Sequence, residues 1–292
     1  MSRPLRLQFP GALYHVTVRG NKKADIFLTD VNRRIFLKTL KETIKTHNWL
    51  CHAYCLMNNH FHLAIETLEG NLSEGMRDLD GIYTSRFNKY NATVGHLFQG
   101  RFKAFLVEKE TYLLEVARYI VLNPVRAGMV ANPEDWAWSS YGATAGLKPP
   151  PAWLTTDWLL AFFSADRVKA MREYRDFVAA GIGKETPLKE AGKGQILGSE
   201  QFIHSVWELK GDTDHLKEVP RAQRIIGRPT VKEIFEGLDN KQARNDAIVF
   251  ARERCGYSIA EIARCLRLSE PAISKIAHGK PTDSKKPRKT KK

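Results

Sequence analysis

The 292-residue sequence is poor in cysteine and contains no long apolar run. Its four cysteines fall in two distant pairs, Cys51 with Cys55 and Cys255 with Cys265, so they form no disulfide framework and suit a reducing compartment. No stretch approaches the length of a membrane span, and the first residues, MSRPLRLQFPGALYHV, lack the apolar core and cleavage site of a signal peptide. We therefore expect a folded cytoplasmic protein.

Acidic residues are also in the minority. The chain has 32 Asp and Glu against 46 Lys and Arg, which gives a formal net charge of +14 and a pI of about 9.6. Lys and Arg gain free energy from counterion release when they neutralise nucleic acid, whereas a membrane partner would call for an amphipathic basic helix, and none stands out. Basicity also suits a ribosomal or simply a soluble protein, because net charge indicates partners and not a fold.

The first half of the sequence alternates strand-like and helix-like segments. Their order is β-α-β-β-α-β-α, and the turn Asn58-Asn59 joins the second and third strands as a hairpin. Asn123-Pro124 is expected to end the last helix, since the residue before proline disfavours helical backbone. The order predicts an α+β fold with a ferredoxin-like antiparallel sheet and helices on one face. The expected elements are residues 12–20, 29–47, 50–57, 60–66, 72–90, 96–109 and 111–122.

Composition divides the chain further. The run Pro149-Pro150-Pro151 is expected to end a first domain of residues 1–150. Residues 151–226 are predicted to be a helical connecting region and show no recognisable chemistry. Residues 227–280 are predicted to form a helix-turn-helix domain, and residues 281–292, which end in KKPRKTKK, a disordered basic tail.

The helix-turn-helix prediction rests on apolar spacing. Four apolar residues form one helix face and two more anchor a second helix that Ser269 would cap. The second helix would present Ser269, Ser274 and Lys275 to a major groove of duplex DNA, with Glu270 an awkward neighbour for phosphates. Helix pairs of this shape also occur in domains that bind no DNA. The apolar residues are Ile259, Ile262, Ala263, Leu266, Ile273 and Ile276.

Two histidines in the third predicted strand are the first candidates for chemistry. Residues i and i+2 of a strand point from one face, about 6.6 to 6.8 Å apart, so His60 and His62 can reach one metal ion. Backbone or water could equally satisfy them. Tyr119 and Asn123, four residues apart on the last helix, share a face that could meet the same metal. A phenol with an ordinary pKa near 10 is a poor nucleophile unless a cation polarises its target, and such a tyrosine more often packs in a core.

Three segments in order, NNHFHL, LFQGRFK and ARYIVLNPVRAG, resemble the REP-associated tyrosine transposases of the HUH single-tyrosine, IS200-like superfamily. The resemblance covers about residues 8 to 145. It implies that His60, His62 and Asn123 bind Mg²⁺ or Mn²⁺ and that Tyr119 attacks DNA to give a 5′-phosphotyrosine link and a free 3′-OH. Imidazole is a soft ligand for Mg²⁺, so the chemistry alone favours Mn²⁺.

A single-strand nuclease needs a basic groove with stacking platforms. Phe98 and Phe102 are candidate platforms, although ordinary core packing is the commoner role of such residues. For the basic candidates a solvated surface is as good an interpretation as a DNA contact. They are Arg19, Lys22, Lys23, Arg101, Lys103 and Arg126.

A zinc site is a minor alternative. Cys51, Cys55 and His52 lie close in sequence, but C-x3-C without a second paired cluster departs from the usual spacing of structural zinc sites. Strand alternation also places His52 opposite the two cysteines.

These observations predict a metal-dependent single-strand DNA endonuclease and strand transferase, transposase-like, acting on repeat or hairpin DNA as a monomer or homodimer. Its C-terminal module would bind duplex DNA. Replication initiators and relaxases offer an enzymatic alternative. A rival of another class is a non-catalytic DNA-binding regulator with a vestigial metal site, which would bind DNA without nicking it.

Overall fold

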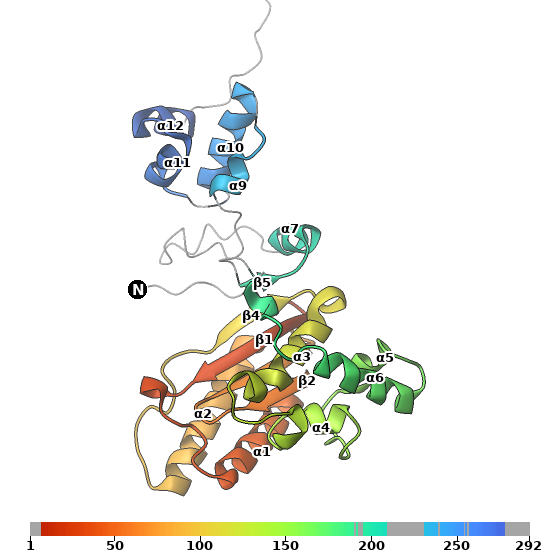
Figure 1. The fold of residues 1–292 in the computed structure, drawn as a ribbon. Coiled ribbons are helices and arrows are strands. Elements are labelled where there is room, and N and C mark those ends of the chain that lie inside the picture. Colours follow the sequence, from red (N-terminus) through yellow and green to blue (C-terminus); the bar gives the residue numbers. More distant parts are fainter. Residues whose placement is uncertain are drawn as a thin grey trace, which may run out of the picture. The chain divides into compact units, whose positions relative to one another are not determined.

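The computed structural model describes residues 7–189, 191, 195–208, 231–238, 240–253, 255 and 257–277. The chain forms two compact units, one of Arg6–Gly211 and a second that includes Asp212–Lys292 (Figure 1). The predicted basic tail at 281–292 lies outside the described residues. The boundary between the units thus follows Gly211, not residue 150, and the separate roles assigned to the predicted domains stay predictions.

A five-stranded sheet forms the centre of the first unit. Its order is β2-β3-β1-β4-β5, antiparallel throughout except for β5, which runs parallel to β4. The first four strands have the order of a ferredoxin-like sheet, so the α+β class is confirmed. The strands are β1 (Ala12–Arg19), β2 (Trp49–Leu56), β3 (His60–Thr67), β4 (Lys103–Val107) and β5 (Ile196–Leu197).

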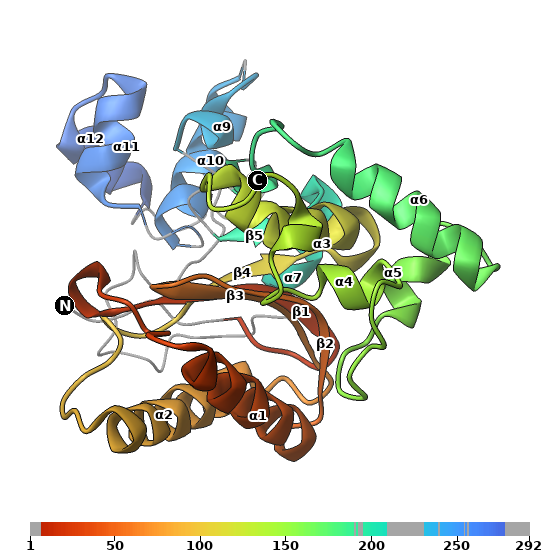
Figure 2. The same ribbon diagram turned by 60° about the horizontal axis from the view of Figure 1, so that its bottom comes forward.

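Helices cover both faces of this sheet. Helices α1 (Asp30–Thr46) and α2 (Leu72–Asn91) pack on one face and α3 (Lys109–Arg126) on the other, as Figure 2 shows. The expectation of helices on one face was therefore wrong in this detail. The physical reason is in the strands, since β1, β2 and β3 are buried along nearly their whole length and need apolar cover on both sides.

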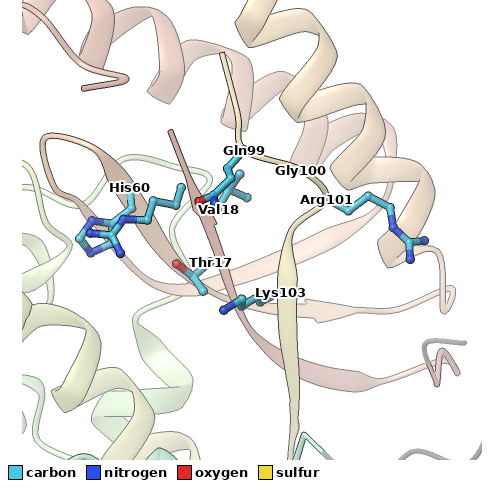
Figure 3. Close-up of a pocket in the computed structure, with 8 residues that line it drawn as sticks. Thr17, Val18, His60, Gln99, Gly100, Arg101 and Lys103 are labelled. Atoms are coloured by element: carbon cyan, nitrogen blue, oxygen red, sulfur yellow. The ribbon is translucent and has the colours of Figure 1, made fainter. Parts of the chain in front are cut away.

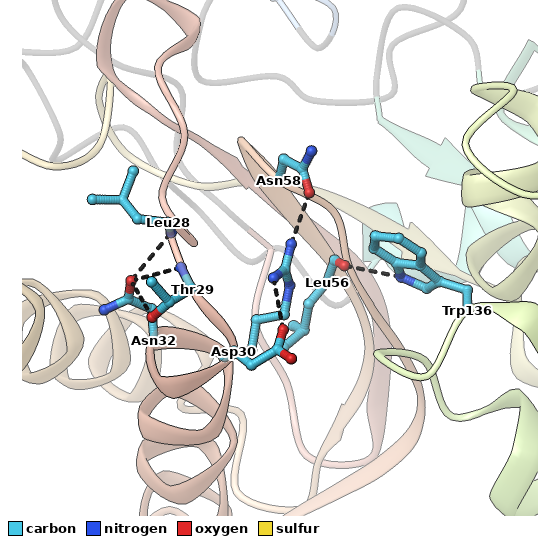
Figure 4. Close-up of polar contacts among 8 residues, drawn as sticks. Leu28, Thr29, Asp30, Asn32, Leu56, Asn58 and Trp136 are labelled. Carbon is cyan, nitrogen blue, oxygen red and sulfur yellow. Dashed lines mark hydrogen bonds and ion pairs between the residues drawn. The ribbon is translucent and has the colours of Figure 1, made fainter.

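Helix α1 begins at a capped turn, next to the expected start at residue 29. The Asn32 side chain accepts hydrogen bonds from the backbone N–H groups of Leu28 and Thr29, at 3.1 and 3.2 Å, and Thr29 is the N-cap (Figure 4). On its inner side, the ring of Phe36 lies 4.6 Å from that of Phe61 on β3. The helix is thereby fixed against the hairpin that carries the histidines.

Helix α3 does not end before Pro124 but continues to Arg126, so the expected break at Asn123-Pro124 was wrong. A proline inside a helix leaves the carbonyl four residues earlier without its N–H partner, here that of Ile120. The Asn123 side chain supplies a substitute, because its Nδ2 donates to the carbonyls of Tyr119 at 2.9 Å and Ile120 at 3.4 Å. The asparagine thus offsets part of the cost of the proline.

Short elements that follow α3 belong to the same unit, where an apolar cluster joins α3 to α6 through Val121, Leu122 and Tyr174. Both sheet edges are also covered. Leu106 N donates to Gln195 O at the β4 edge, and Leu56 N donates to Trp138 O at the β2 edge. The elements are η2 (Pro133–Asp135), α4 (Tyr141–Thr144), α5 (Asp157–Ala161), α6 (Arg167–Ala179), η3 (Pro187–Lys189) and α7 (Glu200–Glu208).

The described part of the second unit is helical, as predicted. Ser258 caps α11 by accepting from Glu261 N, and Arg267 turns the chain with a left-handed φ of 53° between α11 and α12. Ile248, Ile262 and Ile273 are fully buried and hold α10, α11 and α12 together. The helices are α9 (Val231–Phe235), α10 (Lys241–Glu253), α11 (Ile259–Leu266) and α12 (Glu270–Ala277).

Candidate active site

His60 stands at the start of β3 with a defined tautomer. Its Nδ1 lies 2.7 Å from Oδ1 of Asn59, and Nδ2 of Asn59 donates to the carbonyl of Lys23 at 3.0 Å. Because that second bond fixes which end of the Asn59 amide faces His60, Oδ1 must accept and Nδ1–H of His60 must donate. The Nε2 atom of His60 therefore carries a free lone pair, as a metal ligand requires.

His62 lies on the same sheet face and meets a third imidazole that the sequence analysis missed. Its Nδ1 is 2.9 Å from Nε2 of His15 on β1, and the two rings are nearly coplanar, at 11° with centroids 5.1 Å apart. Both residues are buried. The signal was available, because strand alternation places His15 on the face opposite Tyr14 and Val16, but pairing it with His62 requires the register of β1 with β3.

The structure brings Tyr119 to this pair. Its ring lies edge-on to His15 and His62, with centroids 5.7 and 5.9 Å away, and its side chain is half-buried. The guanidinium carbon of Arg126 lies 5.4 Å from the centre of the Tyr119 ring, and Arg126 also donates to the carbonyl of Lys184. Helix α3 thus crosses the histidine face, with its tyrosine partly open to solvent.

Asn123 follows Tyr119 by one helical turn. Because Nδ2 is engaged with backbone carbonyls of its own helix, Oδ1 is the atom of this amide that remains available to a cation. The distance from Asn123 to the histidines is set by α3, which also positions Tyr119. The contact of Asn123 with a metal stays a prediction.

The three imidazoles are held neutral. Burial lowers the pKa of His15 to about 4, and burial together with nearby Arg19 lowers the pKa of His60 to about 4. Burial, His15 and His60 hold the pKa of His62 well below its usual value. Neutral imidazole is the form that binds metals, so the site is prepared for a cation at neutral pH.

The residues fit a divalent cation. Nε2 of His62 is buried and has no hydrogen-bond partner among the described residues, as expected for an atom that a metal would satisfy. Nε2 of His60 and Oδ1 of Asn123 would complete a set of two nitrogens and one oxygen, with positions left for water or phosphate oxygens. Within the described part of the chain, no three His, Cys, Asp or Glu side chains cluster as a metal site, which gives the zinc alternative no support.

A cavity of about 420 Å³ opens beside His60 (Figure 3). Two of the predicted DNA contacts, Arg19 and Lys103, line it at the ends of β1 and β4. Arg101 lines it too, but Figure 3 shows its side chain pointing away from His60. Its full lining is Thr17, Val18, Arg19, His60, Gln99, Gly100, Arg101 and Lys103.

The other predicted contacts fall outside this lining. Lys22 and Lys23 are exposed in the short 3₁₀ segment η1 (Asn21–Lys23) and both have positive φ, 50° and 65°. The possible stacking platforms turn inward instead, since Phe102 is 6% exposed and the ring of Phe98 packs 6.3 Å from those of Phe61 and Tyr83.

The hairpin turn before His60 is clamped from α1. Arg33 donates from Nη2 to Oδ1 of Asn58 at 2.7 Å and pairs with Asp30 at 3.3 Å (Figure 4). Its guanidinium carbon lies 5.6 to 5.8 Å from the ring centres of Phe27, Trp136 and Trp138. The arginine is buried, and with Asn58 it fixes the turn from which β3 starts.

In the second unit, the predicted DNA contacts lie on α12 and just before it. Ser269 and Lys275 are exposed, and Ser274 is half-buried. Glu270 begins the helix and is exposed as well.

Two histidines and one tyrosine thus meet on one face of a ferredoxin-like sheet, the arrangement that the resemblance to single-tyrosine HUH domains implies. Residues 9–123 match the family described as Transposase IS200 like. This part of the chain is similar to that family.

The chain is also similar to a protein of Haemophilus influenzae that is provisionally named a REP-associated tyrosine transposase. The two are 25% identical over 142 residues, which cover 45% of this chain and 80% of the relative. A solved structure of a REP-associated tyrosine transposase bound to a REP hairpin covers 54% of this chain and 93% of that one, with 19% identity and a TM-score of 0.44.

No helix among the described residues is long and apolar enough to cross a membrane.

Proposed function

We propose that the first unit is a metal-dependent single-strand DNA endonuclease and strand transferase whose nucleophile is Tyr119. The observation that carries the proposal is the position of Tyr119, edge-on to His62, where the buried Nε2 of His62 has no partner among the described residues. The match of residues 9–123 to the family described as Transposase IS200 like supports the same class of chemistry.

The chain's own groups account for the steps of cleavage. The phenolic oxygen of Tyr119 attacks the phosphorus of a phosphodiester, forming an O–P bond as the bond from phosphorus to the 3′-oxygen breaks. The phenol loses its proton, and the departing 3′-oxygen gains one. The link to the 5′-phosphate keeps the energy of the broken ester, so attack by another 3′-OH reverses the step and joins strands.

His60, His62 and Asn123 would hold the divalent cation, Mg²⁺ or Mn²⁺. When bound, such a cation polarises the phosphoryl oxygens and orients the ester for in-line attack. The neutral imidazoles add no charge of their own that would compete with it.

The cavity beside His60 is where we place the strand that enters the site. Arg19 and Lys103 line it and offer two positive charges to phosphates within reach of the histidine. We infer that repeat or hairpin DNA is the substrate, because the Haemophilus influenzae relative named above is named a REP-associated tyrosine transposase. The second unit would bind duplex DNA through α12.

The rival is a DNA-binding regulator that does not cut. It would keep the basic cavity and the helix-turn-helix but would have no use for a tyrosine beside paired histidines.

The test incubates the full chain with labelled single-stranded and hairpin oligonucleotides and Mn²⁺, followed by denaturing electrophoresis. Wild type should form a covalent protein-DNA adduct and Tyr119→Phe should form none. Tyr112→Phe, a partly buried tyrosine two turns earlier on the same helix, is the matched control and should behave as wild type. Adducts that persist in Tyr119→Phe would reassign the nucleophile, and DNA binding without any adduct would favour the regulator.

A further inference from the structure

His15 is buried at the centre of the candidate site, yet the proposed chemistry gives it no task. It is fully buried on the central strand β1, between the ring of Phe105 at 6.0 Å and the edge of Tyr119. A buried imidazole is costly unless its polar atoms are used. Its one described hydrogen bond, at 2.9 Å, joins its Nε2 to Nδ1 of His62, while its Nδ1 is buried without a hydrogen-bond partner among the described residues.

This bond joins two ring nitrogens, so one of them must carry the proton and the other must accept it. If His15 donates, His62 holds its own proton on Nε2, and that N–H points where a cation would bind. If His62 donates from Nδ1, its Nε2 is a bare lone pair. Only the second arrangement makes His62 a metal ligand, and it gives His62 the same tautomer that Asn59 imposes on His60.

We propose that His15 is a positioning residue which accepts the Nδ1–H of His62 and so holds His62 in its metal-binding tautomer and ring orientation. The inference rests on the proposed metal-dependent function. In metal sites the second nitrogen of a ligating histidine is held by an outer acceptor, usually a carboxylate or carbonyl. Here the acceptor is an imidazole, almost coplanar with its partner, so the N–H and the accepting lone pair lie in one plane.

The choice of acceptor has an electrostatic consequence. A carboxylate at this place would bring a negative charge next to the phosphate that the site is proposed to bind. A neutral imidazole orients His62 without that repulsion. The Tyr119 ring contacts both imidazoles in a T-shaped arrangement.

The experiment measures Mn²⁺ binding to the full chain without DNA, by the EPR signal of free Mn²⁺. Three proteins are compared: wild type, His15→Gln and His15→Leu. Glutamine places an acceptor oxygen the same number of bonds from the backbone as Nε2, and leucine places none. We expect His15→Leu to bind Mn²⁺ about 10- to 100-fold more weakly and His15→Gln to stay within about threefold of wild type.

The control is His52→Leu, which removes another fully buried imidazole of the same sheet, bonded to Glu66 at 2.8 Å and not to His62. It should leave Mn²⁺ affinity unchanged, whatever it does to thermal stability. A second measurement needs no variant: ¹⁵N NMR of histidine-labelled wild type with Mg²⁺ should find the His62 proton on Nδ1.

Equal Mn²⁺ affinity in His15→Leu and wild type, or a His62 proton on Nε2, would overturn the role of His15 and leave the proposed nuclease intact. A wild-type chain that binds no Mn²⁺ would instead overturn the metal-dependent function, and the role of His15 with it.

Discussion

Arg33 on α1 donates a 2.7 Å hydrogen bond to Asn58, the residue two positions before His60. This bond connects the helix on one face of the sheet to the turn from which β3, the strand of His60 and His62, starts. The same turn is held by backbone bonds from Ile26 and Phe27 to the carbonyl of Asn58, so its position is determined from two sides.

Replacing Arg33 by methionine should loosen this turn. The change removes a charge-assisted hydrogen bond in a buried site lined by three aromatic rings, and we expect a loss of about 2 to 3 kcal/mol in the free energy of unfolding. Urea denaturation measures it, and adduct formation should fall because His60 is less well positioned. The exposed neighbour Arg34→Met is the control and should change the free energy of unfolding by under about 0.5 kcal/mol. Equal effects of the two changes would contradict the clamp.

Asn123 has a role in the helix and a proposed role at the metal, and the two can be separated. Asn123→Ala should lower the free energy of unfolding by about 1 kcal/mol, because the carbonyl of Ile120 loses its substitute partner beside Pro124. It should also weaken Mn²⁺ binding by removing an oxygen ligand. In the double variant with Pro124→Ala, the helix regains its backbone bond, so the stability should return while the Mn²⁺ affinity should not. Recovery of both would mean that Asn123 acts only on the helix.

Glu66 on β3 pairs with Lys109, the first residue of α3, and we expect this contact to weaken in acid. Burial would raise the pKa of its carboxyl, but hydrogen bonds from His52 and Lys109, at 2.8 and 2.7 to 2.8 Å, lower it overall below 4.5. A carboxyl with a depressed folded-state pKa stabilises the fold above its unfolded pKa, and this stabilisation is lost as pH falls through the folded value. Glu66→Gln should therefore cost about 3 kcal/mol near pH 7 and progressively less below about pH 4.5.

Urea denaturation at a series of pH values measures this convergence. Glu69→Gln, an exposed residue that bonds only Asn48 among the described residues, should show a small, pH-independent difference from wild type. A Glu66→Gln deficit that stays constant down to pH 3 would show that the carboxylate charge does not matter.

The position of Lys103 in the cavity predicts how the affinity for single-stranded DNA depends on salt concentration. If its ammonium contacts one phosphate in the cavity, Lys103→Ala should lower the slope of log affinity against log salt by about 0.7. Arg19→Ala should act similarly. Lys89→Ala removes an exposed charge from α2, on the opposite face of the sheet, and should leave the slope unchanged. Fluorescence anisotropy with a labelled oligonucleotide measures the affinity of the three variants. The same slope in Lys103→Ala, Arg19→Ala and Lys89→Ala would mean that the strand binds outside the cavity.

The proposed role of the second unit predicts that a change on α12 alters the affinity for duplex DNA alone. Lys275→Ala on α12 should weaken binding of duplex DNA and lower its salt slope by about 0.9, while single-strand adduct formation by the first unit continues. Lys241→Ala, exposed at the start of α10, is the matched control. Unchanged duplex affinity in Lys275→Ala would remove α12 from the DNA interface.

Local patterns predicted much of the fold and the residues of the candidate site. The spacing of His60 and His62 and of Tyr119 and Asn123 depends only on the geometry of one strand and one helix, and the structure has that strand and that helix. His15 depends on the register between β1 and β3, which are separated by a helix and a strand, so its partner could not be found locally. The helix end at Asn123-Pro124 was mispredicted because the rule for proline does not anticipate a side chain that replaces the missing bond.

The two covered sheet edges have a consequence for dividing the chain. β4 is paired by Gln195 and Leu197, and β2 by residues 138 to 155, so neither rim offers open backbone groups along the paired stretches. A fragment that ends at residue 150 would keep the histidines and the tyrosine but would expose β4 as an unpaired edge strand. Unpaired strand rims join with one another, so such a fragment should self-associate into sheets between molecules. A recombinant fragment meant to contain the candidate active site should therefore extend past Leu197.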